Sequence, residues 1–219
     1  MPDPYDHTGT ALASAISDEA LFERFVAGDD RCYTQLYERY DKKVLTYLRT
    51  ILREHPDAAD DAFQETFIRL FKERKRRTDD PGAHAPIGSL RSWLFRVAHN
   101  LAISYLRGRK KTTGFTESGE EEHVWDERLM VTVEDSFADV YGEKDPLQEE
   151  ELYGKLLACV EMLPAALREI YVLKELNGLP YEEVTRITGC TYEAARMRLS
   201  RARKTLRTAL SPYLSNDKE

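Results

Sequence analysis

Residues 180–207 read PYEEVTRITGCTYEAARMRLSRARKTLR and determine the fold expected for the C-terminal part of this chain. Two helical patterns lie on either side of Gly189, and a glycine at that place supplies the tight turn that a non-glycine residue makes poorly. The first pattern packs through Val184 and Ile187. The second directs four apolar side chains toward a core at helical spacing: Ala195, Leu199, Ala202 and Leu206. The stretch therefore predicts a helix-turn-helix.

The charge of the second helix is almost entirely positive. Glu193 is its only acidic residue before Arg207, and it stands against six cations: Arg196, Arg198, Arg201, Arg203, Lys204 and Arg207. The whole chain has a formal net charge of -7. Cations gathered on one helix of an acidic protein are typical of a surface that meets a polyanion. We interpret the protein as a nucleic-acid-binding candidate.

Length and composition limit the alternatives. With 219 residues and 42% hydrophobic content, the chain can bury one sizeable core or two small ones, and we expect two. No apolar run reaches the roughly 18 residues of a membrane span, and the first residues lack a signal-peptide pattern. We therefore expect a cytoplasmic protein with no membrane contact. The three cysteines and five histidines are dispersed, so we expect no disulfide framework, metal site or cofactor.

Charge also divides the chain into segments. Residues 65–111 contain twelve Lys or Arg against four Asp or Glu, whereas residues 112–151 contain fourteen acidic residues against Arg128 and Lys144. The acidic segment carries three glycines and shows little helical period, which indicates a flexible linker. We predict a disordered tail at 1–17, a first domain at 18–111, the linker at 112–146, a second domain at 147–214 and a short tail at 215–219.

Apolar spacing in the first domain is helical throughout, so the predicted fold class is all-α, with two small helical domains. Helices are expected over residues 18–27 and 30–53 and from Pro56 onward. A proline- and glycine-bearing loop over 78–88 follows, and Ser89 is the expected N-cap of a fourth helix. That helix should bury Leu90, Trp93, Leu94, Val97, Leu101 and Tyr105.

Four motifs together resemble regions 2 and 4 of the bacterial extracytoplasmic-function sigma factors, a group of the sigma-70 family. They are DDAFQETFIRLFKER, SLRSWLFRVAHNLAISYLRGRKK, LPAALREIYVLKELNG and LPYEEVTRITGCTYEAARMRLSRARKTL. Each alone is a weak signal, because helix-turn-helix signatures are widespread. Four in the family's order, separated by an acidic linker, are a specific signal.

The resemblance implies an alternative sigma factor that binds core RNA polymerase, directs it to promoters and assists melting, without catalysis of its own. The terminal helix-turn-helix would bind the minus-35 element. A recognition helix reads bases with its first turns while later cations hold phosphates. The residues expected at this DNA are Tyr192, Glu193, Arg196, Met197, Arg198, Ser200, Arg201, Arg203 and Lys204. The sequence has Glu193, Ala194 and Ala195 where the family usually has Gly-Thr-Val, which puts the preferred minus-35 sequence in question.

The basic fourth helix would bind the minus-10 element, where capture of unstacked bases opens the duplex. Asn100 matches the family's asparagine and can bond a base edge. The other residues expected there are Arg96, His99, Ser104, Arg107, Arg109, Lys110 and Lys111. For His99 a packed polar role is the alternative. The loop at 78–88 corresponds to the segment that encloses a flipped base, and a solvated insertion is the equal alternative.

A third surface would bind polymerase. By resemblance, the third helix meets the coiled coil of the largest polymerase subunit, and the second domain would meet the flap. The residues expected at the coiled coil are Asp61, Gln64, Glu65, Ile68, Arg69 and Lys72. The acidic linker has two open interpretations, a strand along the polymerase's basic channels or a solvated tether. An anti-sigma factor or another recruiting partner would be a further partner.

Two other classes of function compete with a sigma factor. A helix-turn-helix regulator that acts without polymerase explains the terminal helix but leaves the second basic block with Asn100 unexplained. An enzyme has no support, because the sequence contains no HExxH, Gly-rich phosphate loop, paired catalytic carboxylates or nucleophile-base spacing.

Overall fold

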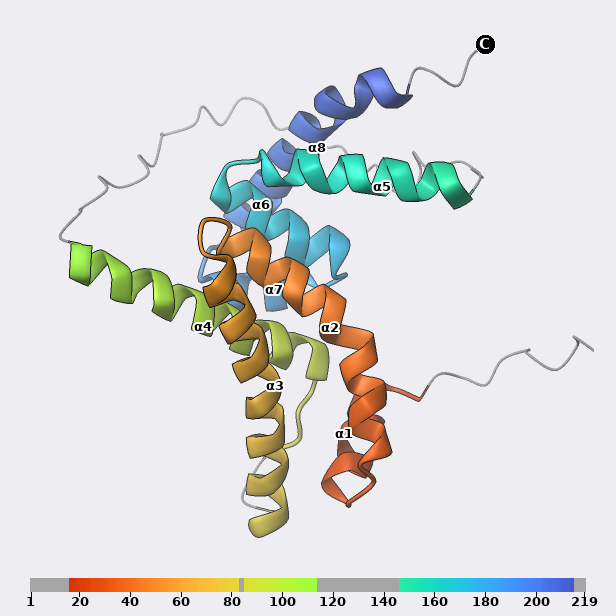
Figure 1. Cartoon of the computed structure of the whole chain (residues 1–219), viewed down its shortest axis with the longest axis vertical. Helices are drawn as coiled ribbons and strands as arrows, with labels where there is room; N and C mark the ends of the chain where they lie inside the picture. The colour runs from red at the N-terminus through yellow and green to blue at the C-terminus, as the bar shows by residue number, and fades with distance from the viewer. Residues whose placement is uncertain (1–15, 83–84, 114–145, 215–219) are drawn as a thin grey trace, which may run out of the picture.

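The computed structural model describes residues 16–82, 85–113 and 146–214, and all regular elements among them are helical (Figure 1). This confirms the predicted all-α class for the described part of the chain. The elements are α1 (Asp18–Val26), α2 (Arg31–Ile51), α3 (Pro56–Asp79), α4 (Leu90–Thr113), α5 (Pro146–Glu161), α6 (Ala165–Tyr171), the π-helical segment η2 (Val172–Leu176), α7 (Tyr181–Thr188) and α8 (Tyr192–Leu214).

Local sequence signals start these helices where expected. The hydroxyl of Ser17 accepts a hydrogen bond from the Ala20 amide at 3.1 Å, and Pro56 occupies the first turn of α3. The predicted N-cap Ser89 is confirmed, since its Oγ accepts from the Ser92 amide at 3.2 Å. Helix α3 continues to Asp79, so the loop begins later than residue 78, where the proline-rich segment was expected to break the helix.

Helices α1 to α4 form an N-terminal group around α2. The apolar side of α2 faces the core of this group, with Leu36, Val44 and Leu48 fully covered. Tyr47 is also fully buried and meets the Phe95 ring edge-on at 5.4 Å between ring centres. Helix α4 packs against α3 as well as α2, so two helices support the basic α4.

Two expectations for α4 were wrong. Tyr105, expected inside, has 38% of its surface exposed, whereas Phe95, which was not expected inside, is fully buried. His99 was placed on the polar face and is instead buried. The cause is that α4 packs against α1, α2 and α3 and also against α7, so its buried surface is broader than one apolar stripe and turned relative to it.

Helices α5 to α8 form a C-terminal group in which α8 packs against α5, α6 and α7. The predicted core residues of the helix-turn-helix are confirmed, because all six are buried: Val184, Ile187, Ala195, Leu199, Ala202 and Leu206. The remaining side of α8 carries its cations. The apolar side of this helix thus fixes which way the basic side points.

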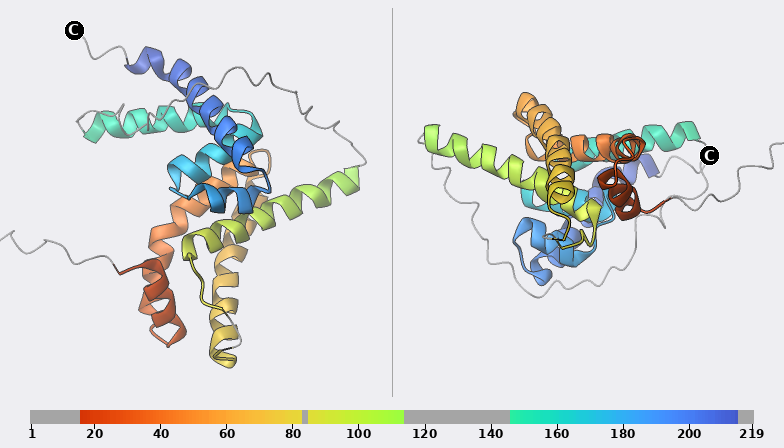
Figure 2. Two further views of the ribbon diagram at one scale, coloured as in Figure 1. Left: turned by 180° about the vertical axis from the view of Figure 1, so that it is seen from behind. Right: turned by 90° about the horizontal axis from the view of Figure 1, so that it is seen from below.

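The two groups pack against each other through α2 with α6 and α4 with α7. Figure 2 shows α4 running beside α7 from both directions. The linker predicted for 112–146 lies almost wholly outside the described residues, so the predicted domain boundaries stay predictions. Where the chain is described, no helix is both long and apolar enough to cross a membrane. The same part contains no group of three His, Cys, Asp or Glu side chains able to hold a metal ion.

Candidate nucleic-acid interface

The helix-turn-helix is built as the sequence predicted. Gly189 adopts φ 72°, in the left-handed region that favours glycine, and its amide donates to the Thr185 carbonyl at 2.8 Å. The hydroxyl of Thr191 then accepts from the Ala194 amide at 3.2 Å and caps the next helix. These two contacts set the angle at which α8 leaves α7.

Most of the residues expected at minus-35 DNA share one side of α8, whereas Arg198 lies toward the packed side, between the core residues Ala195 and Ala202. Six of them are exposed and three are partly exposed. The exposed residues are Tyr192, Glu193, Arg196, Met197, Ser200 and Lys204, and the partly exposed ones are Arg198, Arg201 and Arg203. A side lined by arginines with a methionine and a tyrosine offers both hydrogen-bond donors and apolar contact to base edges.

Arg203 differs from the other cations on this side. It forms an ion pair with Glu175 of η2 at 2.7 Å, and both side chains are largely covered, with 19% and 13% of their surfaces exposed. A charge pair so shielded from water holds α8 against η2. Contact between Arg203 and a phosphate would require this pair to rearrange.

An aromatic pair at the start of the two helices was missed by the sequence analysis. The ring of Tyr181, on α7, lies 5.2 Å from the ring of Tyr192, on α8. The ammonium of Lys174 lies 4.8 Å from the centre of the Tyr181 ring, and the guanidinium of Arg196 lies 6.0 Å from that of Tyr192. Burial is the main cause that raises the pKa of Tyr181. These ring contacts orient Tyr192 and Arg196 at the N-terminal end of α8.

The residues expected at minus-10 DNA mostly lie along one exposed side of α4. Exposed side chains recur at intervals of three to four residues, as neighbours on a helix surface do: Arg96, Asn100, Ser104 and Arg107. Arg109 is also exposed. Lys110 and Lys111 continue the helix, but their side chains lie outside the described residues. The structure thus brings Asn100 and several cations onto one accessible surface.

His99 is separated from this surface. Its Nδ1 lies 2.9 Å from Oε1 of Glu169, on α6, and 3.1 Å from the hydroxyl of Tyr47, on α2. Only 11% of its side chain is exposed. In this arrangement His99 has the packed polar role that was the alternative for it.

A second group missed by the sequence analysis lies at the far end of α4. Arg109 Nη1 is 3.3 Å from Nδ1 of His55, and the His55 ring stands 5.4 Å from that of Tyr105. This group ties the start of α3 to the end of α4. No motif points to His55, because its partners Tyr105 and Arg109 lie fifty or more residues away in sequence.

The residues expected at polymerase lie on the outer side of α3. Ile68 has 47% of its surface exposed, and Asp61, Gln64, Arg69 and Lys72 are exposed beside it. Glu65 accepts hydrogen bonds from Arg69 Nε at 3.1 Å and Lys72 Nζ at 3.4 Å, and the Arg69 bond is the main cause that lowers the pKa of Glu65. An apolar centre flanked by charge is the usual composition of a protein interface.

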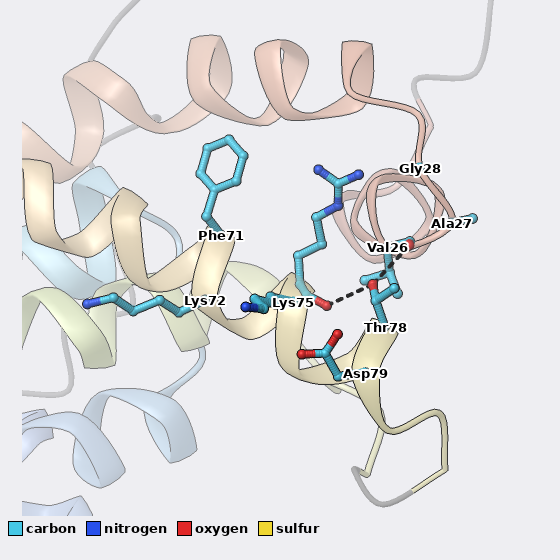
Figure 3. A pocket seen from close by; sticks show the side chains of 9 residues that line it. Val26, Ala27, Gly28, Phe71, Lys72, Lys75, Thr78 and Asp79 are labelled. Carbon is cyan, nitrogen blue, oxygen red and sulfur yellow. Dashed lines mark hydrogen bonds between the residues drawn. The ribbon is translucent and has the colours of Figure 1, made fainter.

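This surface continues into a groove of about 560 Å³ between the ends of α1 and α3 (Figure 3). Phe71 and Lys72 form one wall, and the other comes from Val26, Ala27 and Gly28. The hydroxyl of Thr78 donates to the Arg74 carbonyl at 3.1 Å and also lies 3.4 Å from that of Val26. Phe71 lies at the rim of this groove, with 42% of its surface exposed.

Comparison with known families matches both helical groups. Residues 36–112 match the model of sigma-70 region 2, and residues 153–206 match that of sigma-70 region 4. The first range contains the exposed side of α4 and the second contains the helix-turn-helix.

Comparison with known proteins gives a consistent result. The chain is 26% identical to the ECF RNA polymerase sigma-E factor of Escherichia coli strain K12 over 207 residues, which cover 93% of this chain and 99% of the relative. The protein of that name from Haemophilus influenzae is 26% identical over 205 residues, 93% of this chain and 100% of the relative.

Solved structures show the same fold. One is CnrH in complex with the cytosolic domain of CnrY, with a TM-score of 0.52, 20% identity and coverage of 89% of this chain and 97% of that one. Another is the sigma factor RpoE in complex with the anti-sigma factor NepR from Bartonella quintana, with a TM-score of 0.50, 22% identity and coverage of 82% and 96%. With the models of regions 2 and 4 matched in order over residues 36–112 and 153–206, this chain belongs to the sigma-70 family, and it is similar to RNA polymerase sigma factors of the extracytoplasmic-function group.

Proposed function

We propose that this protein is an alternative sigma factor that binds core RNA polymerase, directs it to promoters with minus-35 and minus-10 elements, and assists their melting. One observation carries the proposal: two exposed basic helical surfaces, on α4 and α8, belong to matches with regions 2 and 4 in the family's order. A regulator that acts alone needs only the second surface.

We assign minus-35 recognition to the first turns of α8. Arg196 and Arg201 have the donors to read the O6 and N7 of guanine, while Met197 offers apolar contact to a thymine methyl group. Lys204, one turn further along, suits a phosphate. Tyr192 and Glu193 would contact the DNA at the N-terminal end of the helix. Tyr181 and Lys174 are positioning residues. The Tyr181 ring contacts Tyr192, and Lys174 contacts the Tyr181 ring.

We assign capture of the minus-10 strand to the exposed side of α4. The amide of Asn100 offers a donor and an acceptor to a base edge, and it stands between Arg96 and Ser104 on the helix surface. Arg107 and Arg109 extend the positive charge along the path of a backbone. Capturing bases as they leave the stack lets the protein favour melting without a motor or catalysis of its own.

We assign the largest-subunit coiled coil of polymerase to the outer side of α3. Ile68 supplies the exposed apolar centre, and the salt-bridged Glu65, Arg69 and Lys72 supply the charged border. The C-terminal group would contact the flap. Since core polymerase works in the cytoplasm, the protein is placed there too. Both structural neighbours described above were solved with another protein bound, which supports an anti-sigma factor or other recruiting partner for this chain.

Footprinting distinguishes this function from that of a helix-turn-helix regulator. The full chain is incubated with a pool of promoter fragments, alone and with core polymerase. We expect protection at defined sites, together with permanganate-reactive thymines at the minus-10 position, only when both proteins are present. Strong protection by the chain alone, unchanged by polymerase, would favour the regulator.

A further inference from the structure

A π-helical turn, η2, joins α6 to the helix-turn-helix. The backbone amide of Asn177 donates to the carbonyl of Val172 at 3.1 Å, five residues earlier, and its side-chain Nδ2 donates to the same carbonyl at 2.8 Å. Asn177 is buried, with 8% of its surface exposed. Single π-helical turns are rare and occur frequently at functional sites. Asn177 thus holds η2 in this wider form by two hydrogen bonds to one carbonyl.

Two consecutive side chains of η2 contact the two helices of the helix-turn-helix. The ammonium of Lys174 lies 4.8 Å from the centre of the Tyr181 ring, on α7. Oε1 of Glu175 accepts a hydrogen bond from Arg203 Nη2, on α8, at 2.7 Å. One turn of the chain therefore contacts both helices. We call Lys174, Glu175, Tyr181 and Arg203 the η2 brace.

Helix α8 is held along one edge at two points. Tyr192 contacts Tyr181 at the start of the helix, with 5.2 Å between ring centres, and Arg203 contacts Glu175 further along. Positions 192 and 203 are eleven apart, which is about three helical turns, so the two residues lie on the same edge about 16 Å from each other. Two fixed points on one edge determine both the direction of the helix and its rotation about its own axis.

The charge pair of the η2 brace is unsuited to phosphate contact. Arg203 keeps 19% of its side chain exposed, and Glu175 keeps 13%. A phosphate bound by Arg203 would draw the guanidinium away and leave the Glu175 carboxylate buried without that cation, an arrangement that is strongly destabilising. Lys204, the next residue, is exposed and can meet a phosphate without breaking such a pair. The two neighbouring cations therefore differ in role.

Base reading depends on the orientation of α8 more than phosphate contact does. Arg196 lies about one turn after Tyr192, close to the first fixed point. A bidentate hydrogen bond to a base edge weakens steeply when its angles change. Attraction between cations and phosphates carries no sequence information and tolerates small shifts. A recognition helix that is free to rock would therefore lose discrimination between bases before it loses affinity for DNA.

We propose that Glu175 and Arg203 are positioning residues for minus-35 recognition. Their ion pair, together with Lys174 on the Tyr181 ring, fixes the recognition helix against η2, and Arg203 itself makes no phosphate contact. The inference rests on the proposed function, because the orientation of α8 matters only if that helix reads DNA. It also revises the role expected for Arg203 from its place among the cations of α8.

Holoenzyme made from core polymerase and the full chain tests the η2 brace. Its affinity is measured for the preferred minus-35 sequence and for single-base variants of it, at several salt concentrations. Arg203→Gln should lower the preference for the correct bases about fivefold or more, the effect of one misaligned base contact, while the slope of log affinity against log salt stays at its natural value. Lys204→Gln is the matched control and should reduce that slope by about one, with base preference unchanged.

The charge-swapped variant E175R/R203E separates positioning from contact. It restores opposite charges between η2 and α8, so base preference should return toward the natural value. If Arg203 bound a phosphate instead, a glutamate in its place would weaken DNA binding beyond the R203Q level. Circular dichroism checks helix content. If R203Q loses helix, Glu175→Gln replaces it, since the amide oxygen still accepts the hydrogen bond, and should show a smaller loss of base preference at an unchanged slope.

The outcomes separate the η2 brace from the proposed function. Reduced base preference in R203Q at an unchanged salt slope, with recovery in the swapped variant, would support the brace. A slope reduced by about one in R203Q, as in K204Q, would assign Arg203 to a phosphate and overturn it. Base preference in R203Q equal to that of the natural chain would overturn it as well. Holoenzyme with the natural chain that shows no base preference at minus-35 would overturn the proposed function itself.

Discussion

In this fold a single polar atom can contact several helices and so help to fix the angles between them. Tyr40 is one example: 2% of its surface is exposed, its hydroxyl donates to Asp18 of α1, and Arg91 Nε of α4 lies 3.4 Å from the same oxygen. Burial is the first cause, and the bond to Asp18 the second, that raise the pKa of Tyr40 to about 12. Three helices therefore meet at one hydroxyl.

Tyr40→Phe removes that hydroxyl while keeping the ring, so the free energy of unfolding at pH 7 should fall by about 1 kcal/mol. The raised pKa means that the folded state favours the neutral phenol. Its stabilising effect is complete below pH 10 and is lost as the pH rises through 12. Urea unfolding should therefore show a smaller alkaline loss for Y40F than for the natural chain, with the half-exposed Tyr213→Phe as control. Equal alkaline losses in Y40F and the natural chain would refute this account of Tyr40.

Two cations of α8 should separate base reading from phosphate contact. Arg196→Ala is expected to weaken holoenzyme binding to its preferred minus-35 sequence by about 1–3 kcal/mol and to relax the choice of base at one position. Lys204→Ala should weaken binding to all sequences about equally and reduce the slope of affinity against salt. Filter binding or anisotropy across a set of minus-35 variants at several salt concentrations measures both. The reverse pattern, with Lys204 altering base choice, would contradict the assigned roles.

At the scale of elements, sequence prediction succeeded where a helix packs on one side and failed where it packs on two. Every core position expected in the helix-turn-helix is buried, since α7 and α8 each show one clear apolar side. Helix α4 meets a distant neighbour, α7, in addition to α1, α2 and α3, and its period could not show that contact. Phe95 and His99 turn toward Tyr47 of α2, His99 also meets Glu169 of α6, and Tyr105 lies beside His55. The apolar period does not show these contacts, which is why the three residues were misplaced while Leu90 and Leu94 were placed correctly.

The aromatic pair across the helix-turn-helix gives a prediction for that element. Tyr181→Leu keeps an apolar side chain on α7 but loses the ring that contacts Tyr192, a type of contact worth about 0.5–1.5 kcal/mol. With Tyr192 and Arg196 less constrained, holoenzyme occupancy of the minus-35 element should fall several-fold while helix content is retained.

Tyr153→Leu, at a half-exposed position of α5, is the matched control for that experiment and should leave occupancy unchanged. Footprint titration with holoenzyme and circular dichroism of the free chain measure the two quantities. Equal occupancy for Tyr181→Leu and Tyr153→Leu would show that the aromatic pair does not orient the recognition helix.

For the whole molecule, the sequence predicted two groups of helices but not their contact. Charge segregation and motif order indicated two basic surfaces separated by an acidic stretch, and both surfaces are present among the described residues. The contact includes Glu169 meeting His99, seventy positions earlier. The spacing of apolar residues cannot predict such a pair, because a lone carboxylate on a helix usually faces water. The contact could be seen only once the groups were placed.

The most direct test of the central claim is run-off transcription by core polymerase, with and without the full chain, on a library of random promoter fragments. Two basic surfaces that read DNA together with polymerase should produce transcripts starting at discrete positions, all preceded by a shared pair of sequence elements, only when the chain is present. Transcripts without a shared upstream element, or the same start sites with and without the chain, would contradict its assignment as the promoter-recognition subunit.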